Sequence, residues 1–153
     1  MNDRSFVIEL LEMPAGFPDE VTLDYHFEQL ASDNEAKEFA ILEREVVPDT
    51  HKPDLSDVKV LTAVGSQTIA KFNESEKSAD AYNTVVIFIA VVRIPKHMTD
   101  VIITLNCPVK IGSGSSSAVM VEHVATNLTE VRDTFQHIVR SFKVHDWSLL
   151  SSQ

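Results

Sequence analysis

Two carboxylates three residues apart, Glu9 and Glu12, are the side chains near the start of the chain whose type and spacing suggest a binding chemistry. They lie in the run SFVIELLE, residues 5–12, whose alternating apolar residues predict a β-strand. Residues three apart in a strict strand point to opposite faces, which would aim Glu12 at an apolar face where a carboxylate is costly to bury. We therefore expect the strand to end near Leu11, with both carboxylates in solvent at one end of a sheet. The pair is then either solvated or a contact for a basic partner.

The other side chains with catalytic or metal-binding potential form no recognisable motif. The histidines show no zinc-ligand spacing, and with a single cysteine we expect no metal site and no cofactor. The glycine-rich stretch 110–117 lacks the Gly-Lys-Ser/Thr end of a phosphate-binding loop. Cys107 shows no neighbouring base that would activate a thiol. The sequence favours a protein that is not an enzyme, although a cleft that gathers His97, Asp100 or Cys107 beside another titratable group would favour an enzyme.

The elements that must position these residues follow from the apolar periodicity. Strands are predicted over residues 5–12, 38–47, 58–72, 82–94 and 99–106, and helices over about 18–31 and 117–141. The first strand is expected to bury Phe6, Ile8 and Leu10 on one face, and the strand 82–94 to be covered on both faces. Gly65 suggests a bulge or bend. Short connections favour antiparallel pairing, so the fold class is α+β, with a sheet between helices.

The charge of the chain restricts its partners. Lys and Arg number 13 and Asp and Glu 23, giving a net charge of −10. Residues 1–57 hold 15 of the acids and 4 of the bases, so the whole excess lies there. This balance argues against nucleic acid and against an anionic membrane surface as partners, and it suggests either a solubilising surface or an acidic docking face.

Cysteine content and apolar runs bear on the compartment. One cysteine allows no internal disulfide, and no signal peptide is recognisable at the N-terminus. The longest apolar run, residues 85–92, is far too short to span a membrane. We expect a protein of the nucleus and cytoplasm.

Five segments in order resemble one family, the Ran guanine nucleotide release factors, which are MOG-type nuclear import factors. The matching segments are SFVIELLE (5–12), YHFE (25–28), QTIAKFN (67–73), RIP with TDVIITLNCP (93–95 and 99–108) and FKVHDWSL (142–149). The resemblance spans nearly the whole chain but starts after the N-terminal segment that family members carry. It implies a single domain over residues 1–153 that lacks this segment.

The resemblance also implies a fold and a function. The fold is an antiparallel sheet of about five to six strands between helices, shared with the PsbP photosystem proteins. The activity is binding of the small GTPase Ran by a monomer, with release of guanine nucleotide in support of nuclear import and without chemical catalysis. The family's acidic pair maps onto Glu9 and Glu12. The alternative is a PsbP-like small-ligand or scaffold domain without GTPase activity, which a large pocket lined by apolar residues would favour.

Overall fold

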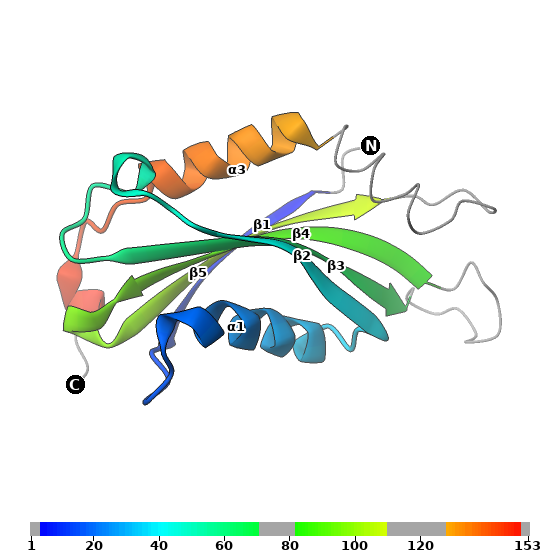
Figure 1. The fold of residues 1–153 in the computed structure, drawn as a ribbon, viewed down its shortest axis with the longest axis horizontal. Helices are drawn as coiled ribbons and strands as arrows, with labels where there is room; N and C mark the ends of the chain where they lie inside the picture. Colours follow the sequence, from blue (N-terminus) through cyan, green and yellow to red (C-terminus); the bar gives the residue numbers. More distant parts are fainter. Residues whose placement is uncertain (1–3, 71–81, 110–127, 151–153) are drawn as a thin grey trace.

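A computed structural model describes residues 4–70, 82–109 and 128–150 of the chain. In these residues five strands form one sheet with the order β1-β5-β4-β3-β2, in which every neighbouring pair is antiparallel (Figure 1). The strands are β1 (Ser5–Glu12), β2 (Glu38–Val46), β3 (Lys59–Ala70), β4 (Tyr82–Ile94) and β5 (Thr99–Val109). All five predicted strands and their antiparallel pairing are therefore confirmed.

Two α-helices of the described residues lie on opposite faces of the sheet (Figure 1). The first, α1 (Asp19–Asp33), follows the prediction closely, because Pro18 sets the backbone just before it and acids fill its first turn. The second helix, α3 (Thr129–Ser141), begins after Leu128. The prediction of one helix over 117–141 is therefore wrong at Leu128, which is not helical. Residues 117–127 lie outside the described part. The structure has the predicted α+β class, with helix, sheet and helix in three layers.

Short 3₁₀ helices complete the described chain: η1 (Asp49–His51), η3 (Pro95–His97) and η4 (Trp147–Leu150). The hairpin link between β4 and β5 is η3, and Met98 after it has a left-handed backbone, with φ of 48°. None of the helices in the described ranges is long and apolar enough to cross a lipid bilayer.

Strand β4 lies at the centre of two apolar layers, as its β-branched sequence predicted. Its residues alternate between the α1 side, with Ile87 and Ile89, and the α3 side, with Phe88 and Ala90, and none of these four is more than 2% exposed. Side chains of α1 close the first layer, and the buried stripe of α3 closes the second. Burial on both faces is what holds the sheet between the helices.

Edge strand β1 is not covered in this way. All eight of its residues are exposed, including Phe6 at 44%, Ile8 at 47% and Leu10 at 51%, so the prediction that these three form a core face is wrong. A helix is about 10 Å wide and strands are about 4.8 Å apart, so one helix covers only part of a five-stranded sheet. Helix α1 packs on β2, β3 and β4, and α3 packs on β4. Neither helix packs closely on β1.

Gly65 has a packing role rather than the predicted irregularity of its own strand. Strand β3 runs through Gly65 in regular register with Ile87 of β4, and the bulge lies on the neighbouring strand β2, between Ile41 and Glu43. A Cβ at Gly65 would meet the ring of Phe27 and would lie 2.6 Å from the backbone oxygen of Ala40. The absence of a side chain lets the fully buried Phe27 of α1 rest on the sheet.

Replacing Gly65 by alanine is expected to lower the free energy of unfolding by about 2–3 kcal/mol, because the added methyl overfills a closed contact. Urea denaturation followed by circular dichroism measures the change. Adding Phe27→Leu should recover part of the loss, since the smaller side chain leaves the ring's space free. A Gly65→Ala variant as stable as the parent would show that α1 does not sit on the sheet at this point.

Candidate functional site

The acidic pair of the sequence lies on the β1 edge of the sheet. Glu9 pairs with Ile102 and Glu12 with Thr99, in an uninterrupted antiparallel register with β5. The strand runs through Glu12, so the expectation that it ends near Leu11 is wrong by one residue. Both glutamates are nevertheless exposed, as expected.

The two carboxylates point to opposite faces of the sheet. Ile102, opposite Glu9, belongs to the apolar layer under α1, so Glu9 points to the α1 face. Glu12 comes three residues later in a regular strand and points to the α3 face, about 10 Å along the chain. The structure therefore does not gather the pair into one cluster. It places one carboxylate on each side of the same edge.

No described residue forms an ion pair or hydrogen bond with the side chain of Glu9 or Glu12. Glu9 lines a hollow of about 40 Å³ beside α1, together with Gln29 and Asp33. Leu10 and Leu11, between the two glutamates, are 51% and 41% exposed. The edge thus offers two carboxylates without a partner among the described residues, flanking apolar surface, a combination suited to a basic protein surface with an apolar centre.

A buried polar network lies beneath α1, next to this edge. Asp100 of β5, which is fully buried, accepts a hydrogen bond on one oxygen from Nε of Arg93 at 3.0 Å. Its other oxygen lies 2.9 Å from Nε2 of His26 on α1. Arg93 and His26 are only 3% and 5% exposed. Because a buried carboxylate is tolerated only when it is paired and hydrogen-bonded, these three side chains depend on one another.

The network continues to the N-terminus of α1. Nη1 of Arg93 donates to the backbone oxygen of Phe17 at 3.1 Å and to Asp19 at 2.9 Å. Asp19 also pairs with Lys59 of β3 at 2.9 Å. The hydrogen bond from Lys59, with a further one from Arg93, holds the pKa of Asp19 below its usual value, and the same carboxylate raises the pKa of Lys59. The network fastens the start of α1 to β3, β4 and β5.

Its position links the network to the acidic edge. Asp100 is the cross-strand partner of Leu11, so the strand segment that carries Glu12 is paired with the residue that His26 and Arg93 hold. The sequence predictions missed this arrangement. The available signal was a set of charged or polar residues at the ends of apolar segments, since His26, Arg93 and Asp100 come from three separate motifs.

Of the three residues whose presence in a cleft beside another titratable group would favour an enzyme, Asp100 lies 2.9 Å from His26, but that pair is buried beneath α1. Asp100 is buried on the α1 face, whereas Cys107 is 2% exposed in the α3-side layer, seven residues further along β5. Burial raises the pKa of the Cys107 thiol, which disfavours the nucleophilic thiolate. His97 stacks on Trp147 of η4, with ring centroids 5.0 Å apart. The described residues hold no group of three or more His, Cys, Asp or Glu placed to bind a metal ion.

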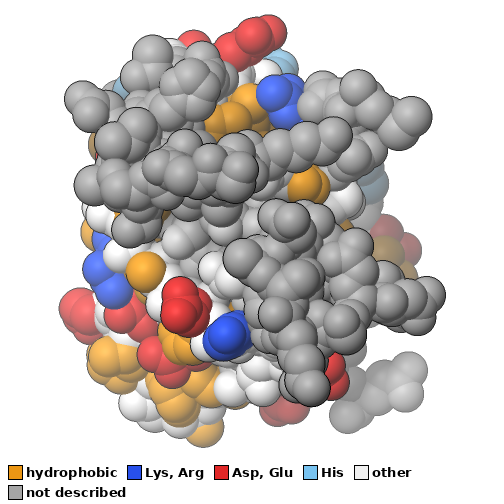
Figure 2. All heavy atoms as spheres, turned by 90° about the vertical axis from the view of Figure 1, so that its right-hand side faces the viewer, with side chains coloured by type: hydrophobic (Ala, Val, Ile, Leu, Met, Phe, Trp, Pro, Cys, Tyr) orange, Lys and Arg blue, Asp and Glu red, His pale blue; other side chains and the backbone are white. Residues whose placement is uncertain are grey.

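The acidic excess of the first 57 residues is shared among several surfaces. Some acids are paired, as in the two-pronged ion pair of Asp24 on α1 with Arg44 on β2, at 2.8 Å for each contact. On the end of the molecule shown in Figure 2, acidic side chains lie beside lysine or arginine and hydrophobic side chains. Part of the acidic excess is therefore neutralised by neighbouring cations, and the position of individual carboxylates matters more than the net charge.

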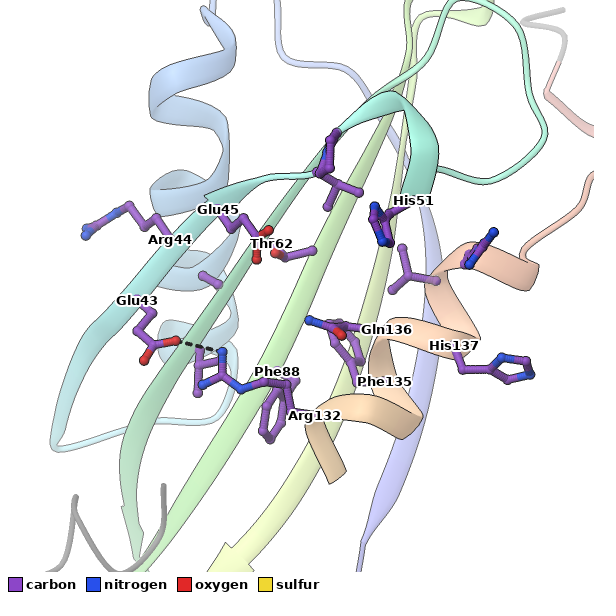
Figure 3. Close-up of a pocket in the computed structure, with 16 residues that line it drawn as sticks. Glu43, Arg44, Glu45, His51, Thr62, Phe88, Arg132, Phe135, Gln136 and His137 are labelled. Carbon is purple, nitrogen blue, oxygen red and sulfur yellow. Dashed lines mark hydrogen bonds and ion pairs between the residues drawn. The ribbon is translucent and has the colours of Figure 1, made fainter. Parts of the chain in front are cut away.

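A groove of about 710 Å³ lies between α3 and the strands β2 and β3 (Figure 3). Its lining mixes apolar and charged side chains: Glu43, Arg44, Glu45, Val47, Pro48, His51, Thr62, Ala63, Val64, Phe88, Arg132, Phe135, Gln136, His137, Val139 and Arg140. The alternative interpretation expected a large pocket lined by apolar residues. The groove has the size but a mixed lining.

Comparison with known proteins places this chain in a family. A family model described as "Ran-interacting Mog1 protein" matches residues 1–108. The "Ran guanine nucleotide release factor" of Danio rerio is 34% identical over 150 residues, which cover 94% of this chain and 76% of the relative. The "Probable ran guanine nucleotide release factor" of Dictyostelium discoideum is 29% identical and is covered to the same 76%.

Solved structures are similar in fold. The Ran-binding protein Mog1p of Saccharomyces cerevisiae superposes with a TM-score of 0.66 at 22% identity, over 97% of this chain and 71% of that one. A mutant of protein Mog1 gives a TM-score of 0.68 at 23% identity, with the same coverage. The strand and helix arrangement is therefore one already seen in experimental structures.

Proposed function

Because the chain belongs to the family of Ran-interacting Mog1 proteins, we propose that it binds the small GTPase Ran through the β1 edge and promotes release of guanine nucleotide from it. The observation that supports this site is the pair of exposed carboxylates, Glu9 and Glu12, which have no partner among the described residues and lie on an exposed edge strand. We further propose that the activity supports nuclear protein import and that the protein acts in the nucleus and cytoplasm as a monomer.

The position of the glutamates determines how such a partner docks. Glu9 points to the α1 face and Glu12 to the α3 face, so a basic surface must straddle the edge to reach both. Leu10 and Leu11 lie between them and supply the apolar contact, each being more than 40% exposed before binding. Charges at the two ends fix the orientation and speed the encounter, and burial of the leucines stabilises the complex.

Release of nucleotide follows from preferential binding and needs no catalytic group. A protein that binds nucleotide-free Ran more tightly than loaded Ran lowers the affinity of Ran for nucleotide by the same factor. Each tenfold preference corresponds to about 1.4 kcal/mol. The role of the β1 edge is then to contact a surface of Ran that is better exposed, or better shaped, once the nucleotide has left.

The proposal is tested by mixing the protein with Ran that carries a fluorescent derivative of GDP or GTP and by following the loss of fluorescence. We expect release to accelerate in proportion to the protein added until Ran is saturated. Parallel pull-downs measure binding itself. If the protein binds Ran but does not speed nucleotide release, the proposed release activity is wrong and only Ran binding stands. If it neither binds Ran nor speeds release, Ran is not its partner.

A further inference from the structure

The groove between α3 and strands β2 and β3 arises because one helix cannot cover the sheet. On the α3 face, α3 packs on β4, with the rings of Phe88 and Phe135 5.7 Å apart. At about 10 Å wide, the helix leaves β2 and part of β3, around Thr62 and Val64, incompletely covered on that face. Figure 3 shows the resulting opening between the strands and the helix.

The floor of the groove is apolar and its volume is that of a ligand site. Phe88, Phe135 and Val139 contribute buried side chains, and Val64 and Val47 are half-buried. A volume of about 710 Å³ falls within the usual range of small-molecule pockets, about 300–1,000 Å³. Covering such a floor removes apolar surface from water and favours binding of an apolar body.

The charges on the walls are arranged along the groove. At one end Glu43 of β2 and Arg132 of α3 form an ion pair of 2.8 Å across the opening, drawn as the dashed line in Figure 3. Arg44 is held on the opposite face of the sheet by Asp24. Glu45 is the remaining carboxylate of the lining.

Nitrogen-bearing side chains remain near the other end. His51 of η1 lies beside the later turns of α3 in Figure 3, and Arg140 lies in the last turn of that helix. Arg140 has no ion-pair partner among the described residues, and His137 also lines the opening. An anionic group that enters the groove therefore meets Arg140 away from the neutralised Glu43–Arg132 pair.

We propose that this groove is a binding site for a small amphipathic anion, a molecule with an apolar body and one carboxylate, sulfonate or phosphate group. The apolar body lies on the floor formed by Val64, Phe88 and Phe135, and the anionic group lies at the Arg140 and His51 end. Glu45 lies between Glu43 and His51 on the β2 side of the groove (Figure 3), so it repels the anionic group from the β2 wall and toward Arg140 on the α3 wall. The site is separate from the β1 edge and does not depend on Ran binding.

The test uses the aromatic sulfonate 8-anilinonaphthalene-1-sulfonate, whose fluorescence rises when it enters an apolar site. We expect saturable binding that weakens at least tenfold in Arg140→Glu and tightens in Glu45→Gln, because the first change reverses the attracting charge and the second removes a repelling one. Lys96→Glu, the same charge change on the exposed 3₁₀ helix η3, is the matched control and should bind as the parent does. Equal affinity in Arg140→Glu and Lys96→Glu overturns the proposal.

A second variant separates the groove from the exposed apolar side chains of β1. Thr62 lies on the floor opposite Glu45, so Thr62→Trp fills the groove and should abolish probe binding, with folding checked by circular dichroism. Decanoate should displace the probe from the parent protein and decanol should do so far less. Binding retained in a folded Thr62→Trp variant, or equal displacement by the acid and the alcohol, contradicts the proposed ligand class. The Arg140→Glu comparison decides the question if Thr62→Trp fails to fold.

Discussion

Replacing Asp100 by alanine is expected to lower the free energy of unfolding by about 3–5 kcal/mol, because the change removes the buried counter-charge of the Arg93 guanidinium and leaves it only the partly exposed Asp19. Arg93 is 3% exposed and keeps only Asp19 and a backbone oxygen as partners. In the same variant His26 loses its hydrogen bond to Asp100, which is its contact with β5 in the described network. Domains are commonly stable by about 5–15 kcal/mol, so the variant loses a large share of its stability. Urea denaturation measures the shift of the midpoint.

The control for this variant is Asp133→Ala, which removes an exposed carboxylate from α3 and should change stability by no more than about 0.5 kcal/mol. A double variant, Arg93→Met with Asp100→Leu, should be more stable than Asp100→Ala alone, because no buried charge then lacks a partner. If the Asp100 and Asp133 variants unfold at the same urea concentration, the buried network does not hold α1 on the sheet.

Reversing both edge charges, Glu9→Lys with Glu12→Lys, is expected to weaken Ran binding by about a hundredfold or more and to slow nucleotide release accordingly. Removing one member of a desolvated charge pair costs about 2–5 kcal/mol, and about 1.4 kcal/mol corresponds to tenfold. Both residues are exposed and carry no described partner, so the fold should be unaffected. Because the carboxylates lie on opposite faces, each single variant should lose part of the affinity. Titration of fluorescent Ran measures both the affinity and its salt dependence.

The matched control reverses two glutamates on the opposite edge strand, Glu38→Lys with Glu45→Lys. Each pair of reversals makes the net charge four units more positive, from −10 to −6. Both double variants therefore have the same net charge. The β2 variant should bind Ran nearly as the parent does. Equal weakening by the two double variants would mean that net charge, and not the β1 edge, determines the interaction.

The strand pattern was predictable because it depends on local sequence. Alternation and β-branched runs located all five strands, and β4 matches its predicted bounds, 82–94. Helix α1 was located by Pro18 and the acids after it. The helix prediction for 117–141 failed at Leu128 because an apolar stripe marks the face of a helix better than its first residue. The sequence indicated a structural role for Gly65. The cause of that role, the ring of Phe27 packed against it, lies on a different element and was not predictable.

The candidate site was only partly predictable for the same reason. The exposure of Glu9 and Glu12 followed from their chemistry, because an unpaired carboxylate is costly to bury. Their separation onto two faces required knowledge that β1 continues in register through Glu12. The buried network joins His26 of α1, Arg93 of β4 and Asp100 of β5. His26 is far from the other two in the sequence, and no local pattern indicates contact between residues so far apart.

By itself the sequence determined the α+β class, the strands, the acidic pair and the resemblance to Ran release factors, since these depend on residue type and short-range spacing. Only the tertiary structure decided which strand lies at an edge, and therefore that Phe6, Ile8 and Leu10 are exposed on β1 rather than buried. It also decided that α3 leaves a groove over β2 and β3. The physical reason is geometric: alternation shows that a strand has two faces, whereas burial of those faces depends on how far a helix about 10 Å wide extends across the sheet.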